Sequence, residues 1–139
     1  MINIVITGAS GFLGTALIKR LHNDGINVIA LKKRRMNRRV PTDYIGEYVY
    51  YDYVEELKYL VNWTKVHAIV HLATSYGRNN KTELEECNLE LPLRLLSLAN
   101  NNHISFFLNA DSFFSDVPDQ YSYLTDYRTS KRNFREQAK

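Results

Sequence analysis

The sequence predicts an α/β protein built on an incomplete, doubly wound parallel sheet of about five strands. Short apolar runs alternate with stretches of helical periodicity along the chain, and a glycine-rich turn joins the first run to the first helical stretch. This alternation implies right-handed crossovers, which place successive strands in one parallel sheet. Because 139 residues correspond to about one domain, we expect one domain over residues 1–139 and no separate substrate domain.

The first part of the chain contains three expected strands and one helix. Ile2–Thr7 is an apolar run that Gly8 ends, and apolar residues then recur at helical spacing as far as Gly25. Val28–Leu31 is expected as the second strand and Tyr48–Tyr51 as the third, with a basic loop between them. The order is therefore strand, glycine-rich turn, helix, strand, strand.

A helix and a fourth strand are expected next. Four apolar residues of residues 57–63 fall on one side of a helix, and they are Leu57, Leu60, Val61 and Trp63. His67–Leu72 is apolar apart from the two histidines, His67 at its start and His71 near its end. Such a run is typical of a strand that is buried on both faces of a parallel sheet.

The last part of the chain contains a long helix, a fifth strand and a final helix. Thr82-x-x-Glu85 has the pattern of a capping box, so the long helix is expected to open there, and Pro92 should kink it. Ile104–Leu108 is the expected fifth strand. A loop follows, and the final helix is expected from about Leu124 toward the C-terminus.

Charge is concentrated in one segment. The net charge is +3, but six of the eighteen cations lie within residues 32–39, and the remaining twelve face fifteen carboxylates. This distribution predicts that the chain meets one anionic group at one loop, and it argues against a nucleic-acid partner.

Membrane, disulfide and metal functions are not expected. No apolar run approaches the roughly 20 residues that a membrane span needs, and Met1–Ile4 has no basic region or cleavage site of a secretion signal. We therefore expect a cytoplasmic protein without a membrane partner. The single Cys87 cannot form an internal disulfide or a Cys-rich zinc site, so we expect a small buried apolar residue there and no metal.

The segment Gly8–Gly14 has the pattern of a dinucleotide-binding turn. Gly8 permits the tight turn, Gly11 lets the backbone approach a phosphate, and Gly14 lets the helix pack closely. A pyrophosphate would then lie on the amides of the helix N-terminus. The alternative is a turn that is merely rich in glycine.

The end of the second strand indicates which dinucleotide is bound. An acidic residue there binds the ribose 2′-hydroxyl of NAD, whereas a basic residue favours the 2′-phosphate of NADP. Here four basic residues, Lys32–Arg35, follow Leu31. We therefore expect NADP rather than NAD, with Lys33 and Arg34 as the contacts. A solvated basic loop is the alternative.

Tyr127 and Lys131 form a candidate catalytic pair. Their i, i+4 spacing places both on one side of a helix. A free tyrosine has a pKa near 10, and a neighbouring ammonium favours its phenolate, so the pair suits proton transfer at neutral pH. Because the chain holds ten tyrosines, a chance match is the alternative.

Together these motifs resemble an extended short-chain dehydrogenase/reductase. The resemblance rests on Gly8–Gly14, His71–Thr74, Asn88 and Tyr127-x-x-x-Lys131. Within that superfamily the chain is similar to the NAD(P)-dependent nucleotide-sugar epimerases, dehydratases and 4-keto-reductases. It is most similar to CDP-sugar 4-reductases of the abequose synthase type, through the stretches His71–Gly77, Asn109–Phe114 and Ser130–Phe134.

The resemblance implies a Rossmann-type, NADP(H)-binding part of an enzyme of deoxysugar and surface-polysaccharide biosynthesis. It implies a nucleotide-sugar substrate and a homo-oligomer. It also implies that the pyrophosphate contacts are Gly8, Gly11, Phe12 and Leu13.

Further site roles follow from the same resemblance. Asp52 would contact adenine, Ala73 would lie near the nicotinamide-side ribose, and Lys131 would bind that ribose while tuning Tyr127. Asn88 would be a structural hydrogen-bonding residue. The alternatives are a helix N-cap for Asp52 and a packed histidine at the end of a strand for His71.

Two departures from the family pattern set the alternatives for function. The serine or threonine expected after the fifth strand aligns with Ala110, and Ser112 is the candidate replacement in the catalytic triad. The expected sugar-binding region does not follow Lys139. We therefore expect cofactor binding without activity in this chain alone. The rival interpretations are a non-catalytic dinucleotide-binding or subunit-interaction module and a truncated product without function.

Overall fold

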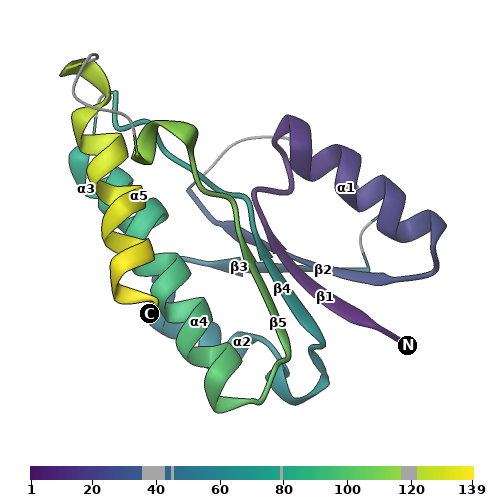
Figure 1. Ribbon diagram of the computed structural model, residues 1–139. Helices are drawn as coiled ribbons and strands as arrows, with labels where there is room; N and C mark the ends of the chain where they lie inside the picture. Colours follow the sequence, from purple (N-terminus) through teal and green to yellow (C-terminus); the bar gives the residue numbers. More distant parts are fainter. Residues whose placement is uncertain (36–42, 45, 79, 117–121) are drawn as a thin grey trace.

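Five parallel strands form one twisted sheet, so the predicted fold class is confirmed (Figure 1). The structure is a computed structural model, and it describes residues 1–35, 43–44, 46–78, 80–116 and 122–139. The strand order is β3-β2-β1-β4-β5. The strands are β1 (Asn3–Thr7), β2 (Asn27–Lys33), β3 (Glu47–Tyr51), β4 (Ala68–His71) and β5 (Phe106–Asn109).

Helices cover both faces of the sheet (Figure 1). They are α1 (Phe12–Asn23), α2 (Leu57–Leu60), α3 (Lys81–Glu85), α4 (Leu91–Asn101) and α5 (Thr125–Gln137). α1 lies on one face, and the other helices lie on the opposite face. In the part of the chain that the structure describes, no helix is both long and apolar enough to cross a membrane.

The core has two parts, one on each face of the sheet. Val5 and Ile69 are fully buried against Leu95 of α4, whereas Ile6 and Ile18 are fully buried between the sheet and α1. Burial of each such side chain contributes about 1.5–3 kcal/mol. Successive residues of β1 therefore face different helices, as the pleat of a strand between two helical layers requires.

The basic segment begins inside a strand, not after it. β2 continues to Lys33, and its last two residues pair with Tyr50 and Tyr51 of β3. Because side chains alternate across a strand, Lys32 and Lys33 point to opposite faces of the sheet. The prediction that Lys32 and Lys33 lie in a loop is therefore wrong. Residues 38 and 39 lie outside the described residues.

The single helix expected over residues 57–63 is also wrong. The segment holds two 3₁₀ turns, Val54–Glu56 and Trp63–Lys65, on either side of the short α2. Val61 is extended, with φ −119° and ψ 137°. The indole N–H of Trp63 donates to the Leu57 carbonyl at 2.8 Å and so occupies the acceptor that the next helical turn would use.

The long helix opens two residues earlier than the capping-box pattern predicts. Asn80 is the N-cap, and its side-chain oxygen accepts the N–H of Glu83 at 3.1 Å, so the role assigned to Thr82 is wrong. The disturbance expected at Pro92 takes the form of a π-helical segment, Glu86–Glu90, in which the Leu91 N–H bonds five residues back.

β5 forms one edge of the sheet and is covered on one face only. Phe107 packs toward Phe134 of α5, with ring centroids 6.4 Å apart. Phe106 and Leu108 lie on the other face, opposite Ala68 and Val70 of β4, and are 55% and 40% exposed. The sheet face that α1 covers elsewhere is therefore open at β5.

Candidate functional site

The glycine-rich turn between β1 and α1 is too tight for side chains at two positions. Gly8 has a φ of +72°, and a Cβ atom there would lie 2.6 Å from the backbone nitrogen of Ala73. A Cβ atom at Gly14 would lie 2.1 Å from the Gly8 carbonyl oxygen. Gly14 therefore lets α1 pack directly against the turn, and the turn lies against the end of β4.

The N-terminus of α1 is open and uncapped. Gly11 is the N-cap residue and supplies no side-chain hydrogen bond, and the first turn of α1 contains no acidic residue. Phe12 is 96% exposed and Leu13 is also exposed. The first N–H groups of a helix lack acceptors within the helix and carry its positive partial charge. This geometry fits the pyrophosphate of a dinucleotide.

Thr7 joins the ends of β1 and β4 beneath this turn. Its hydroxyl oxygen accepts the N–H groups of Leu72 and Ala73, at 3.2 and 3.1 Å. The hydroxyl lies 2.7 Å from Nδ1 of His71, and because it already accepts twice, its proton is the one available to that nitrogen. The network fixes Ala73 over Gly8.

His71 is a packed, neutral histidine. It is fully buried. Burial, with the nearby charge of Lys131 as a smaller cause, lowers the pKa of His71 to about 3. The histidine therefore holds the strand end in place through Thr7.

The two cations predicted to bind the 2′-phosphate both have carboxylate partners. Lys33 is ion-paired with Glu86 of the π-helical segment, and both side chains are largely buried. Arg34 donates from Nε to Asp52 at 3.1 Å, and its side chain is 62% exposed. The structure thus distinguishes a partly buried ion pair, Lys33–Glu86, from a more exposed one, Arg34–Asp52.

Asp52, predicted to contact adenine, follows β3 and pairs with Arg34. Its N–H donates to the Glu56 carboxylate at 3.0 Å. The N-cap of the following 3₁₀ turn is Tyr53, so the alternative of Asp52 as the N-cap is wrong by one residue. The adenine contact stays a prediction.

α5 brings Tyr127 and Lys131 to the carboxyl edge of the sheet. Both residues are buried, at 7% and 3% exposure. Lys131 Nζ donates to the carbonyl of Ala110, directly after β5, at 2.9 Å, and burial lowers the pKa of Lys131. Tyr127 stacks on the ring of Tyr76 with centroids 4.9 Å apart.

The position after β5 carries no hydroxyl. Ala110 contributes only its backbone, since its N–H donates to the His71 carbonyl and its own carbonyl accepts Lys131. Ser112 is the N-cap of the 3₁₀ turn Phe113–Ser115, and its hydroxyl accepts the N–H of Phe114 at 3.2 Å. The structure gives Ser112 a capping contact, and its catalytic role stays a prediction.

Asn88 links the segment after β4 to α5, in the structural role that the resemblance implies. It is 1% exposed, and its amide oxygen accepts both the Ser75 N–H and the Thr74 hydroxyl. Its amide nitrogen donates to the Ser75 carbonyl and to Ser130 Oγ. Ser130 in turn donates to the Tyr127 carbonyl at 2.8 Å.

Three residues of this site were not predicted from the sequence. Tyr76 covers Tyr127, Glu86 pairs with Lys33, and Thr7 holds the strand ends together. A polar residue directly after the apolar run Ile4–Ile6 was the available signal for Thr7. The other two contacts join segments about 50 residues apart, which no local pattern records.

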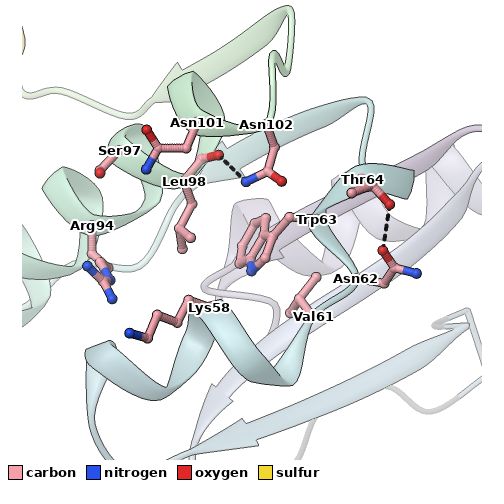
Figure 2. A pocket seen from close by; sticks show the side chains of 10 residues that line it. All are labelled: Lys58, Val61, Asn62, Trp63, Thr64, Arg94, Ser97, Leu98, Asn101 and Asn102. Atoms are coloured by element: carbon pink, nitrogen blue, oxygen red, sulfur yellow. Dashed lines mark hydrogen bonds between the residues drawn. The ribbon is translucent and has the colours of Figure 1, made fainter.

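A separate cavity of about 360 Å³ lies between residues 58–64 and the second half of α4 (Figure 2). Trp63 and Leu98 form its apolar wall, and Lys58 and Arg94 lie at one side. The lining segments lead into the amino ends of β4 and β5, at the edge of the sheet opposite the glycine-rich turn. No residue of the predicted site lines this cavity. The candidate site therefore lies away from it, at the carboxyl edge of the sheet.

Among the described residues no group of His, Cys, Asp and Glu side chains is arranged to hold a metal ion.

Comparison with known proteins finds relatives in sequence and in fold. The chain is 38% identical over 138 residues to CDP-abequose synthase of Salmonella muenchen, an alignment that covers 98% of this chain and 46% of that protein. UDP-N-acetylglucosamine 4-epimerase from Bacillus cereus superposes with a TM-score of 0.72 at 27% identity, over 99% of this chain and 48% of that one.

The same fold occurs in UDP-glucose 4-epimerase of Thermus thermophilus, solved in complex with NAD, with a TM-score of 0.77 at 19% identity over 98% of this chain and 49% of that one. The chain therefore spans about half the length of the relatives that it matches. The profile of one family matches residues 4–139, nearly the whole chain. On this match, the chain belongs to the NAD dependent epimerase/dehydratase family.

Proposed function

We propose that this chain is the NADP(H)-binding portion of a nucleotide-sugar 4-keto-reductase or epimerase. The observation that carries the proposal is the meeting of two features at the carboxyl edge of the sheet. The uncapped N-terminus of α1 follows β1, and Lys131, one helical turn from Tyr127, bonds to the backbone that follows β5. Only β4 separates β1 from β5. A dinucleotide held at the first feature can reach the second, as ligands do in the crevice beyond the strand ends of open α/β sheets.

The choice of NADP over NAD rests on Arg34. An exposed ion pair such as Arg34–Asp52 contributes about 0–1 kcal/mol, so a phosphate can take over Arg34 at little cost. Lys33 is held by a less exposed pair with Glu86, and separating that pair costs more. We therefore assign the 2′-phosphate to Arg34 before Lys33.

In the proposed reaction, the chain's residues orient the reactants and move one proton. The bound cofactor supplies the hydride for the sugar 4-keto carbon. Tyr127 donates the proton to the reacting oxygen, a general-acid contribution of about 10²–10⁴-fold. Lys131, buried and held on the Ala110 carbonyl, presents its amino group one helical turn from Tyr127 and binds the ribose.

We propose that this chain does not turn over a nucleotide-linked 4-keto sugar by itself. Orientation of well-placed reactants contributes up to about 7–11 kcal/mol, and the matched relatives are about twice as long as this chain. The alignments with the two relatives each cover 46% of the relative's length. Steady-state assays on a sample of verified mass should detect no oxidation of NADPH above background, and robust reductase activity would contradict the proposal.

One observation favours a second candidate function, a dinucleotide-binding module without catalysis. The family's hydroxyl after the fifth strand is replaced by the methyl group of Ala110. Under this alternative, when the chain is joined to the second half of a relative, Ala110→Ser should not raise the reductase rate of the joined protein. Under the reductase proposal, the same substitution should raise the rate of that joined chain.

The cofactor assignment is tested by titration. We expect the wild-type chain to bind NADPH more tightly than NADH, and Arg34→Ala to remove most of that difference. Lys19→Ala is the matched control, because Lys19 is an exposed cation on α1, away from the end of β2. Equal affinities for the two cofactors in the wild type, or an unchanged preference in Arg34→Ala, would refute the assignment.

A further inference from the structure

Tyr76 has an unusual position for an exposed aromatic residue. It lies in the irregular segment after β4, is 54% exposed, and stacks on Tyr127 at an interplanar angle of 27°. Tyr127 itself is 7% exposed. The candidate proton donor is therefore covered by a ring that itself faces solvent.

The backbone on both sides of Tyr76 is fixed. Ser75 exchanges two hydrogen bonds with Asn88, at 2.9 and 2.7 Å. Gly77 donates its N–H to Ser75 Oγ and has a φ of +66°, and a Cβ atom there would lie 2.3 Å from Leu84. A side chain at Gly77 would be strained by this positive φ and would have to displace the Leu84 side chain, so glycine suits the turn that presents Tyr76.

The same network fixes Tyr127. Asn88 donates to Ser130, which donates to the Tyr127 carbonyl, so one buried amide ties the backbones beneath both rings. All four hydrogen bonds of the Asn88 amide are made. A fully satisfied buried network of this kind holds one geometry. The stacking of the two rings is therefore built into the fold.

We propose that Tyr76 is a positioning residue of the site, which shields Tyr127 from water and fixes the plane of its ring. The proposal rests on the proposed function for the role of Tyr127 as proton donor. Excluding water from the donor prevents loss of its proton to solvent, and a fixed ring keeps the hydroxyl aimed at one place. A stacked ring does both without a hydrogen bond, so phenylalanine at position 76 suffices and leucine does not.

The test is the rate at which tetranitromethane nitrates Tyr127, followed by mass spectrometry of peptides. In the wild type, the exposed Tyr53 and Tyr59 should react well before Tyr127. Tyr76→Leu should raise the rate at Tyr127 about three- to tenfold, the range expected for loss of one aromatic pair. Tyr76→Phe should leave the rate unchanged, and Tyr59→Leu is the matched control.

Equal nitration of Tyr127 in the wild type and Tyr76→Leu would overturn the proposal, as would Tyr76→Phe behaving like Tyr76→Leu. If Tyr76→Leu does not fold, a nuclear Overhauser effect between the rings of Tyr76 and Tyr127 in the wild type supports the stacking, and its absence refutes it. Neither measurement needs a cofactor, so failure here is distinguishable from failure of dinucleotide binding.

Discussion

At the scale of single residues, the site depends on polar groups buried beneath the glycine-rich turn. Thr7 Oγ1 accepts two backbone N–H groups and lies within hydrogen-bond distance of His71. The turn's glycine spacing could be recognised from the sequence, because the chemistry of a phosphate turn is local. The Thr7 and Glu86 contacts could not, because they depend on how the strand ends and the π-helical segment pack.

Thr7→Val should destabilise the chain by about 1–3 kcal/mol, because it leaves the Ala73 N–H without its acceptor and removes one of the two acceptors of the Leu72 N–H, which keeps the Thr7 carbonyl. Urea unfolding measures this free energy. Thr7→Ser keeps the hydroxyl and should recover most of the loss. A valine variant as stable as the wild type would show that the network contributes nothing.

The stability of the chain should fall as the pH falls from about 6.5 toward 3. The folded pKa of His71 is about 3 and its unfolded value is 6.5, so within this window the unfolded state binds a proton that the folded state does not. The contribution is complete above pH 6.5 and is lost at up to about 1.4 kcal/mol per pH unit. Urea unfolding at several pH values measures the slope. His71→Gln should flatten it, and an identical slope in that variant would exclude His71 as the cause.

At the scale of elements, the sequence was sufficient to predict where the strands lie, but it predicted the ends of the helices less well. The apolar runs of β1, β2 and β4 are short and continuous because these strands are buried between two helical layers, and this pattern is local. The helix over residues 57–63 failed because the Trp63 indole takes the Leu57 carbonyl, a tertiary contact. At the long helix, Asn80 and Thr82 are both suitable N-caps by residue type, and packing decides between them.

Asn80→Ala should therefore cost about 0.5–2 kcal/mol of stability, because the Glu83 N–H loses its acceptor. Thr82→Ala is the matched control, since Thr82 is exposed within α3, and it should change stability by less than about 0.5 kcal/mol. Thermal unfolding of both variants compares them. A larger loss of stability in Thr82→Ala than in Asn80→Ala would show that Thr82 is the N-cap, as the capping-box pattern predicts.

At the scale of the whole molecule, β5 is an edge strand with no further partner strand among the described residues, and one of its faces is open there. Such an edge presents free N–H and C=O groups, and exposed apolar residues attract a partner. Because α5 lies on the same face as α4, a right-handed crossover after it would place a further strand at this edge (Figure 1). The structure identifies Phe106 and Leu108 as the apolar residues that this face exposes.

We propose that the chain self-associates through this edge. Light scattering at several concentrations should show a mass above that of one chain, and Phe106→Lys should lower it toward the monomer. Phe113→Lys is the matched control, because Phe113 is equally apolar and 82% exposed but lies outside the sheet. A wild type that is monomeric at all concentrations and unfolds cooperatively would contradict this proposal.

The most direct test of the proposed dinucleotide site is calorimetric titration of the chain with NADPH, comparing the wild type with Leu13→Glu. A carboxylate at this exposed position stabilises the N-terminus of α1 by about 0.3–1 kcal/mol and repels a pyrophosphate from the same amides. Ala16→Glu adds the same charge one turn further along α1 and serves as the control. We expect the wild type and Ala16→Glu to bind NADPH, and Leu13→Glu to bind it at least about tenfold more weakly while remaining folded. Absence of binding to the wild type, or equal affinity in Leu13→Glu, would contradict the proposed binding site.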